Sequence, residues 1–239
     1  MTHNQWSLPP LPTSTLVSNN GEEPHIDAEI NKAMKNYEHT EIVDGSPEQY
    51  EKVKQAIYDL LDAFNVNWDD PNYSETPDRV ARAYLDYWAT GYTRDIHKEA
   101  KIFPNESGFE DLIIVKDMKF YSMCSHHLAP FSGHAAIAYV PNKEKYIGLS
   151  KLGRILEIYA RRFQLQERIT AQVADALVEL LDPLGVMVVL YNVEHGCMSS
   201  RGIQMHEANT TTSAVRGYFQ KDAKDSGALR KEALSLMKL

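Results

Sequence analysis

Cysteine is scarce in this sequence, and a long hydrophobic run and an excess of basic charge are both lacking. No apolar stretch approaches the roughly 20 residues that a membrane span requires, so we expect a soluble protein. The net charge of -8 and a pI near 5.6 argue against nonspecific nucleic-acid binding, so any anion site must be local. The first residues have neither the basic nor the apolar region of a secretory signal. We therefore expect a cytoplasmic protein with reduced thiols.

The two cysteines both have histidines as close neighbours. They lie in the segments Cys124-Ser-His126-His127 and His195-Gly-Cys197. This pairing favours a metal site over a disulfide or two buried apolar cysteines, because thiolate and imidazole suit Zn²⁺, which takes about four tetrahedral ligands. Two thiols exclude Cys₄ and Cys₃His sites within one chain. A Cys₂His₂ site remains, or a catalytic site with three ligands and an open position for water.

The spacing of these residues leaves two histidines with alternative roles. His127 follows Cys124 by three residues, so one tight turn can present both to one ion. Alternation along an extended segment would put His195 and Cys197 on the same side. His195 and His126 are each either a fourth ligand or a proton-transfer group near the metal, since an unperturbed pKa of about 6.5 suits such work. A hydrogen-bonded core position is the alternative for any single histidine.

The periodicity of apolar residues predicts an α+β fold in which antiparallel strand pairs surround two central helices. Ser46-Pro47 and Thr76-Pro77 predict two helix starts, and Gly91 is expected to end the second helix. The other expected elements are one strand with apolar runs at 112–115 and 118–121, further strands at 135–140, 186–193 and 210–219, and helices at 150–163, 167–181 and 228–238. Residues 1–45, with a weak helical pattern at 26–37, are expected to form a largely flexible extension to a domain at 46–239.

A second group of candidate site residues is cationic. It consists of Arg79, Arg82, Lys151, Arg154 and Arg201. In an acidic protein such a group fits a phosphate. The alternative is that the basic residues on the predicted helices are only solvated faces. Ser150, at a predicted helix start, adds a hydroxyl and the end of the helix dipole that favours an anion.

Four segments resemble the signature segments of GTP cyclohydrolase I. They are Cys124-Ser-His-His127, Gly148-Leu-Ser-Lys-Leu-Gly-Arg154-Ile, Gln164-Leu-Gln-Glu-Arg168-Ile-Thr and His195-Gly-Cys-Met-Ser-Ser-Arg201-Gly-Ile. Their order and spacing match as well. The resemblance extends from about Glu48 to the C-terminus, including Thr76-Pro-Asp-Arg79-Val-Ala-Arg82 and Thr210-Thr-Thr-Ser213, and does not cover the N-terminal segment.

The resemblance implies a tunnelling fold, in which an antiparallel sheet with paired helices assembles into a β-barrel ring. Members of this family form homodecamers of two face-to-face pentamers with shared active sites. The implied reaction converts GTP and water to formate and 7,8-dihydroneopterin triphosphate, the first step of pterin- or folate-type biosynthesis. The expected partners are therefore GTP and further copies of the chain, with no nucleic acid and no membrane.

The resemblance also implies roles for single residues. By position, Cys124, His127 and Cys197 resemble the zinc ligands, with water in the fourth position. Zn²⁺ would lower the pKa of this water from 15.7 towards about 7 and supply hydroxide to attack C8 of the purine. His126 and His195 would move protons, and Ser150 would lie near the opening ribose. Glu167 resembles the acid at the guanine edge, and the other residues that resemble substrate contacts are Gln166 and, around the triphosphate, Arg79, Arg82, Lys151, Arg154 and Arg201.

The sequence departs from the family pattern at a few positions. Ser125 stands where the family commonly has glutamate, and Gly196 and residues 204–209 also differ; these changes put only the tuning of the zinc in doubt. Among related enzymes, a pterin synthase would need three histidines on zinc, and a 7-deazaguanine nitrile reductase would need a nucleophilic cysteine without metal. A noncatalytic scaffold stapled by zinc would need a closed site with His126 or His195 as the fourth ligand.

Overall fold

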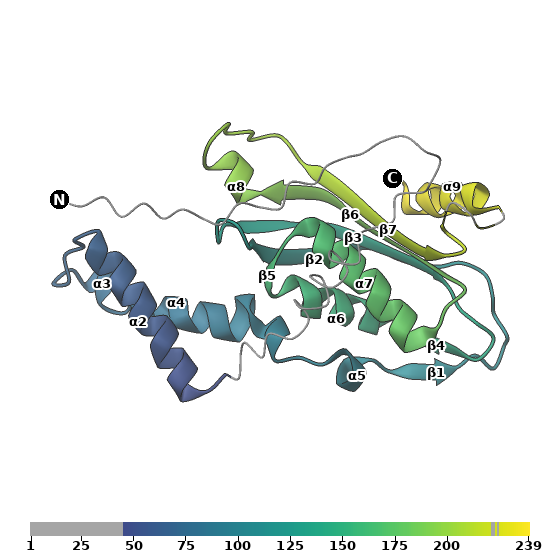
Figure 1. Cartoon of the computed structure of the whole chain (residues 1–239), viewed down its shortest axis with the longest axis horizontal. Helices are drawn as coiled ribbons and strands as arrows, with labels where there is room; N and C mark the ends of the chain where they lie inside the picture. The colour runs from purple at the N-terminus through teal and green to yellow at the C-terminus, as the bar shows by residue number, and fades with distance from the viewer. Residues whose placement is uncertain (1–44, 221–222, 224) are drawn as a thin grey trace, which may run out of the picture. The chain divides into compact units, whose positions relative to one another are not determined.

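Strands rich in apolar residues build a five-stranded sheet in the order β5-β2-β3-β6-β7 (Figure 1). The four longer strands pair antiparallel, which confirms the predicted pairing, and the two-residue β5 runs parallel to β2. They form one continuous sheet, with the two central helices on one face of it rather than surrounded by strand pairs. The strands are β2 (Ile113–Cys124), β3 (Pro130–Val140), β5 (Phe163–Gln164), β6 (Gly185–His195) and β7 (Thr210–Gly217). β3 and β6 lie at the centre, so most of their residues are buried on both faces.

This computed structural model describes residues 45–220, 223 and 225–239. All of them belong to one of the chain's two compact units, Glu41–Leu239. The extension expected at 1–45, with its helical pattern at 26–37, lies outside the described residues except for Gly45. Among the described residues, no helix has both the length and the apolar character that a membrane crossing requires.

Helices cover both faces of the sheet. α6 (Leu149–Ala160) and α7 (Gln166–Leu181) pack on one face, and α9 (Ser226–Met237) packs on part of the other (Figure 1). Alternate residues of β3 belong to the two layers: Ile137 packs with α6 and α7, whereas Ala138 packs with α9. The stripe predicted for α7 is buried throughout, and consists of Ile169, Val173, Ala176, Leu177 and Leu180.

A β-bulge separates the two apolar runs, 112–115 and 118–121, of the first predicted strand. The structure has one strand there, β2, whose pairing with β3 shifts between Val115 and Met118. Asp117 adopts φ 59° in this bulge, and its backbone N–H donates to the Tyr191 hydroxyl at 3.2 Å. The Tyr191 hydroxyl donates in turn to the Asp117 carboxylate at 2.7 Å. The break between the two apolar runs therefore marks a bulge within the strand.

A helical hairpin precedes the sheet. It consists of α2 (Pro47–Ala63), the single turn α3 (Pro71–Ser74) and α4 (Thr76–Ala83). The cap predicted at Ser46 is confirmed, since its hydroxyl accepts from the backbone N–H of Gln49 at 3.2 Å. The cap predicted at Thr76 is wrong: Thr76 is the first helical residue, and its hydroxyl donates to the carbonyl of Asn72. α4 continues as a π-helix, η1 (Tyr84–Trp88), and a 3₁₀ turn, η2 (Thr90–Tyr92).

Residues 91–104 run along α6 in the opposite direction, and we call them segment 91–104. The segment contains the short helix α5 (Ile96–Glu99) and ends in β1 (Ile102–Pro104), which pairs antiparallel with β4 (Lys145–Ile147), the strand that leads into α6. The sequence predicted none of these three short elements. Gly91 N–H donates to the Arg161 carbonyl at 2.8 Å, just beyond the C-terminal end of α6. The helix predicted at 150–163 ends at Ala160, because Phe163 and Gln164 leave it to pair with β2.

Candidate metal centre and active site

Three side chains from separate parts of the chain converge at one end of the sheet. The ligand atoms of Cys124, His127 and Cys197 all lie within 4.8 Å of one another, and Cys124 Sγ is 4.0 Å from His127 Nδ1. Cys124 is buried, Cys197 is half-buried and His127 is exposed. We call these three residues the triad. His126 and His195 are not members of it.

A tight turn presents two members of the triad, as the spacing predicted. Cys124 is the last residue of β2, and its N–H donates to the Ala129 carbonyl at 2.8 Å, where the chain turns back into β3. Leu128 N–H donates to the Cys124 carbonyl at 2.8 Å, and Leu128 has φ 51°. This turn places His127 beside the end of β2. The Ser125 hydroxyl is buried without a partner in the described chain.

The third member comes from a short helix that directly follows the central strand β6. Cys197 lies in α8 (Gly196–Ser199), which begins where β6 ends at His195. The alternation that predicted His195 and Cys197 on the same side therefore does not apply, because the chain is no longer extended at Cys197. A Cβ on Gly196 would lie 2.8 Å from the Pro130 carbonyl oxygen, so only glycine lets α8 approach β3 this closely.

The donor set of the triad fits Zn²⁺. Two thiolates and one imidazole are ligands that zinc accepts, and ligands placed tetrahedrally at roughly 2.0 to 2.3 Å from an ion lie about 3.3 to 3.8 Å from one another. The separations in the triad are close to these values, so small side-chain movements suffice. Burial raises the pKa of the Cys197 thiol, nearby Cys124 raises it further, and Arg201 opposes the shift. A bound cation would reverse this shift and hold the sulfur as thiolate.

His195 is held beside the triad by its own contacts. Its ring stacks on Phe131, with centroids 4.7 Å apart and planes 14° from parallel. Its Nε2 lies 2.9 Å from the Gln166 side-chain oxygen, which also accepts from the Thr210 hydroxyl. Burial lowers the pKa of His195, and the charge of Glu167 acts in the opposite direction. His126, in contrast, is exposed, and its ring meets the ring of His127 edge to face.

The start of α7 carries the two predicted guanine-side residues. Gln166 is 3% exposed, and its Nε2 has no partner in the described chain, whereas Glu167 is exposed. Hydroxyls from β7 fix α7 in this position: Thr210 bonds Gln166, and Thr212 lies 2.7 Å, oxygen to oxygen, from Thr170 one helical turn further on. Alternate residues of β7 thus meet successive turns of α7, and Gln166 and Glu167 face the end of the sheet where His195 lies.

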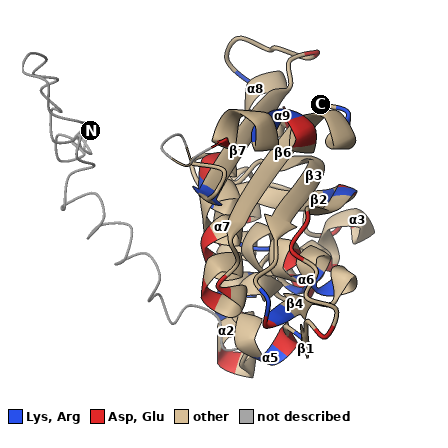
Figure 2. Cartoon of the chain, turned by 90° about the vertical axis from the view of Figure 1, so that its right-hand side faces the viewer, with Lys and Arg blue, Asp and Glu red and all other residues tan. Residues whose placement is uncertain are grey.

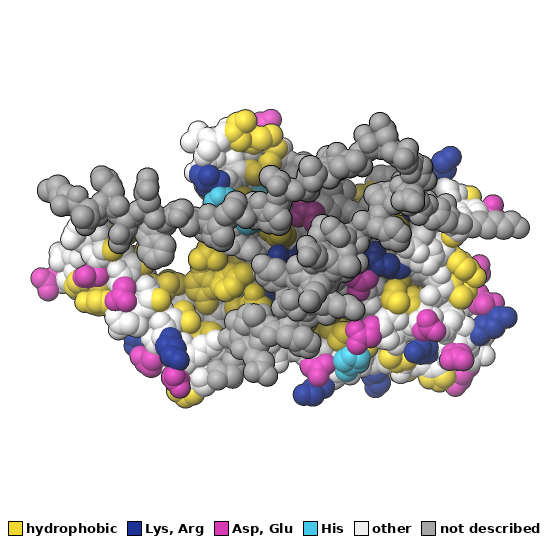
Figure 3. Space-filling view, in the orientation of Figure 1, with side chains coloured by type: hydrophobic (Ala, Val, Ile, Leu, Met, Phe, Trp, Pro, Cys, Tyr) yellow, Lys and Arg dark blue, Asp and Glu magenta, His cyan; other side chains and the backbone are white. Residues whose placement is uncertain are grey.

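The predicted cationic residues fall into three places. Arg201 is near Cys197, whose pKa it affects, and Figure 3 shows cationic and histidine side chains together at the foot of α8. Lys151 and Arg154 lie on α6, next to the exposed Ser150, and act on the Glu99 carboxylate. No contact among the described residues joins Lys151 or Arg154 to the triad within one chain, and the same holds for the remaining two cations. These are Arg79, which pairs with Glu75 at 3.1 Å, and Arg82, which pairs with Asp78 at 2.8 Å, both within the hairpin.

Sequence reasoning missed several residues that position this site. Phe131, which stacks on His195, lay outside the predicted strands and received no role. Thr210 lies in a segment that resembles the family but has no predicted role, and no sequence pattern pointed to Glu99. Each acts across a contact between elements distant in sequence, so no local spacing could have identified it.

Comparison with known proteins agrees with this geometry. A model of the GTP cyclohydrolase I family matches residues 53–237. The chain is 48% identical over 187 residues to GTP cyclohydrolase 1 of Thermoanaerobacter pseudethanolicus, covering 78% of this chain and 96% of the relative. It is 48% identical over 190 residues to that of Halalkalibacterium halodurans, covering 79% and 97%, and 44% identical over 187 residues to that of Clostridioides difficile, covering 78% and 95%. The chain that carries this triad therefore belongs to the GTP cyclohydrolase I family.

Proposed function

We propose that the chain hydrolyses and rearranges GTP to 7,8-dihydroneopterin triphosphate with release of formate, at the start of a pterin- or folate-type pathway. The observation that carries the proposal is the convergence of Cys124, His127 and Cys197 in a chain of this family. His195 is the last residue of β6, the strand that leads into Cys197, and it contacts the start of α7. Metal, proton-transfer and substrate groups can therefore serve one site.

The triad would hold Zn²⁺ with three protein ligands and leave the fourth position open. When bound, zinc supplies a nucleophile at neutral pH by lowering the pKa of a coordinated water. The chain's own part is to hold the ligands: Cys124 is fixed by the hydrogen bonds of the turn, and Cys197 by the close approach of α8 to β3. Three ligands and an open position are typical of catalytic rather than structural zinc sites.

His126 and His195 would carry protons while the imidazole ring of the purine is hydrated and opened. Burial lowers the pKa of His195, so this imidazole is neutral at neutral pH and able to accept a proton. Its bond to the Gln166 oxygen places the ring proton on Nε2 and leaves Nδ1 as the accepting atom. His126 is exposed and lies beside His127, so it can exchange protons with solvent.

Guanine would bind at the start of α7. The Glu167 carboxylate would accept hydrogen bonds from the base N1–H and amino group, donors that adenine does not present together on that edge. The buried Nε2 of Gln166, which has no partner in the described chain, would donate to the substrate. A site that hydrogen-bonds a base strongly rejects analogues that leave its buried polar groups unpaired.

The triphosphate would bind cations from several elements. Lys151 and Arg154 lie on α6, and Arg201 lies just after α8. Ser150, at the start of α6, would face the ribose. Arg79 and Arg82 would reach the triphosphate from a neighbouring copy, because within one chain they pair with acids of the hairpin. His127, Glu167 and Arg201 are exposed in a single chain, whereas small-molecule sites bury most of their ligand. This supports a site shared between copies.

The sheet itself offers the surfaces for a ring. Among the described strands, β7 pairs only with β6 and so lies at an edge, and β2 pairs on its outer side only at Met123 and Cys124. Pairing of β7 from one copy with the open edge of β2 from the next would extend the sheet around a barrel and remove both edges. A ring of five copies, doubled face to face, is the decamer we propose. Reducing conditions that keep both thiols available for metal suit the cytoplasm.

The proposal is tested by incubating the zinc-loaded protein with GTP. We expect the ultraviolet absorbance of a dihydropterin to appear together with one equivalent of formate, and no reaction with ATP. Treatment with a chelator should abolish the reaction, and added Zn²⁺ should restore it. Formation of neither product by the zinc-loaded decamer would refute the proposed reaction.

A further inference from the structure

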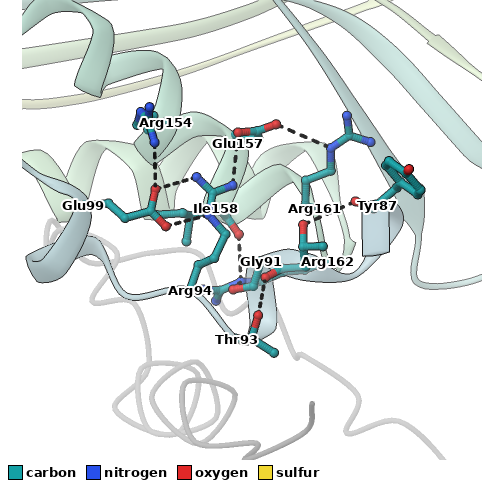
Figure 4. A network of polar contacts seen from close by, with 11 residues as sticks. Tyr87, Gly91, Thr93, Arg94, Glu99, Arg154, Glu157, Ile158, Arg161 and Arg162 are labelled. Carbon is teal, nitrogen blue, oxygen red and sulfur yellow. Dashed lines mark hydrogen bonds and ion pairs between the residues drawn. The ribbon is translucent and has the colours of Figure 1, made fainter. Parts of the chain in front are cut away.

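Charged side chains of segment 91–104 and of α6 form a continuous network between the two. Their arrangement is shown in Figure 4, and Figure 2 shows acidic and basic residues interleaved around α6. Arg161 Nε is 4.0 Å from Glu157, Glu157 is 3.0 Å from Arg94 Nη1, and Arg94 binds Glu99. The last ion pair of the network joins Glu99 to Arg154, which lies on α6 one turn after Lys151. The network therefore reaches the part of α6 proposed to bind the triphosphate.

The two partners of Glu99 hold it very differently. Arg94 Nε and Nη2 both donate to the carboxylate at 2.6 Å, one to each oxygen, and both side chains are only 21% exposed. Such a bidentate pair fixes the position of the carboxylate. Arg154 Nη1 is 3.9 Å from Glu99, and the Arg154 side chain is 56% exposed, so this is a loose surface pair. The Arg154 side chain can therefore move away from Glu99, whereas Arg94 keeps the Glu99 carboxylate in place.

Lys151 acts on the same carboxylate. The pKa of Glu99 is lowered mainly by its hydrogen bonds from Arg94, and the charges of Arg154 and Lys151 lower it further. Glu99 is thus a fixed negative charge next to both α6 cations. Any phosphate that approaches Lys151 and Arg154 meets two cations whose charge Glu99 already partly neutralises.

We propose that Glu99 is a specificity-determining residue that competes with the substrate's triphosphate for Lys151 and Arg154 and so weakens triphosphate binding. This inference rests on the proposed role of these two cations. Substrate and product both carry the triphosphate, so the same carboxylate eases release of the product. Glu99 contacts no reacting atom, and its effect should be confined to ligands that carry phosphate.

The test compares Glu99→Gln with the parent as assembled, zinc-loaded enzymes. Inorganic tripolyphosphate is the probe, because it binds without reacting. We expect its inhibition constant, and the KM for GTP, to fall about three- to tenfold, the order that Coulomb's law gives for removing one neighbouring unit charge near a protein surface. The inhibition constant of guanosine, which has no phosphate, should stay unchanged.

Two variants separate this charge effect from loosening of segment 91–104. Asp175→Asn removes the same charge from another pair with an arginine, Arg216, at 2.7 Å, and should not change tripolyphosphate binding. Glu99→Asp keeps the charge and should bind tripolyphosphate much as the parent does. Unchanged or weaker tripolyphosphate binding in Glu99→Gln would overturn the inference, as would an equal change in guanosine binding, in Asp175→Asn or in Glu99→Asp.

Failure of the proposed function has a different signature. If Lys151→Ala and Arg154→Ala bind tripolyphosphate as well as the parent, these residues are not triphosphate contacts, and the inference falls with that assignment. If both variants bind it more weakly while Glu99→Gln binds it as the parent does, the contacts stand and only the role of Glu99 is wrong.

Discussion

At the scale of single residues, the site depends on contacts made across the fold. Gln166 links α7 to both His195 and Thr210, and Phe131 covers one face of the His195 ring. These contacts fix which nitrogen of His195 carries a proton and keep its imidazole partly buried. Three predictions belong at this scale, because each follows from one side chain and its immediate partners.

The ligand assignment predicts loss of zinc. Cys124→Ala, His127→Ala and Cys197→Ala should each be purified with much less than one zinc per chain and without activity, since two protein ligands hold zinc poorly. Metal analysis of the purified proteins measures this. His97→Ala, which changes an exposed histidine paired with Glu179 on α7, is the control and should keep its zinc. One zinc and full activity in Cys197→Ala would show that the triad is wrongly assigned.

The two other histidines should behave differently from the ligands. His126→Ala and His195→Ala should keep one zinc per chain and lose turnover by about 10²- to 10⁴-fold, the usual contribution of a general acid or base. Parallel metal analysis and steady-state kinetics distinguish the two effects. A variant that loses its metal identifies that histidine as a ligand, in which case the site is closed and the scaffold interpretation gains support.

Base recognition should depend on Glu167. Glu167→Gln should weaken GTP binding by about 1 to 3 kcal/mol, because the amide turns one acceptor into a donor that faces the base. Arg201→Ala should weaken GTP more than guanosine, since it removes a phosphate contact. Competition assays with GTP and guanosine measure both. The assignment fails if Glu167→Gln converts GTP as the parent does and Arg201→Ala affects both ligands equally.

At the scale of elements, close backbone approaches position the helices. A Cβ on Gly91 would lie 2.0 Å from the Ile158 carbonyl oxygen, so segment 91–104 can lie against α6 only with glycine there. The Arg162 guanidinium strengthens this contact by donating to the Gly91 carbonyl at 3.1 Å. α8 approaches β3 in a comparable way at Gly196. Glycine at these two positions lets short elements that bury few apolar residues pack directly against the backbone of α6 and β3.

Gly91→Ala should therefore loosen segment 91–104. We expect a loss of about 1 to 3 kcal/mol, the usual cost of overpacking, seen as a lower thermal midpoint at a fixed protein concentration. Gly227→Ala is the matched control: a Cβ there meets no heavy atom within 4 Å, and the residue is the second of α9, where alanine is favoured. Equal midpoints for Gly91→Ala and the parent would show that the segment is not held by this contact.

At the scale of the whole molecule, several surfaces of the single chain are incomplete. The described helix α2 has no buried residue, and its exposed side includes Leu60 at 54% and, at its C-cap, Phe64 at 76%. Figure 3 shows hydrophobic side chains gathered on one face between the hairpin and the end of the sheet. Exposed apolar surface of this kind is typical of contacts between copies. In the proposed ring the two sheet edges are paired between copies, so the hairpin would be available for a second contact between copies.

This predicts that Phe64→Asp reduces the assembled mass. A charge on an apolar contact between copies should favour species smaller than the proposed decamer, whereas Lys52→Ala, on an exposed part of α2, should not. Sedimentation measures the mass, and circular dichroism checks that the chain remains folded. Activity should fall with the mass where neighbouring copies supply Arg79 and Arg82. A parent that sediments as a monomer would rule out the decamer.

The sequence by itself determined the long elements and limited the candidate metal ligands to two cysteines and the histidines beside them. Apolar periodicity predicted α6, α7 and the long strands, because each buries a continuous face, and two cysteines beside histidines limited the metal ligands to very few choices. Resemblance to the family then supplied the reaction. The sequence did not predict short elements such as α5, β1 and α8, because their few residues are ordered by contacts with other elements rather than by a hydrophobic pattern of their own.

Only the tertiary structure decided which of these residues act together. It brought Cys197 to Cys124 and His127, left His126 and His195 outside the triad, and placed Arg79 and Arg82 on a hairpin with their own acidic partners. It also set Glu99 beside Lys151 and Arg154. The physical reason is that the separation of these groups depends on strand register and on how helices pack against the sheet. Both are set by contacts between residues far apart along the chain, which local spacing does not encode.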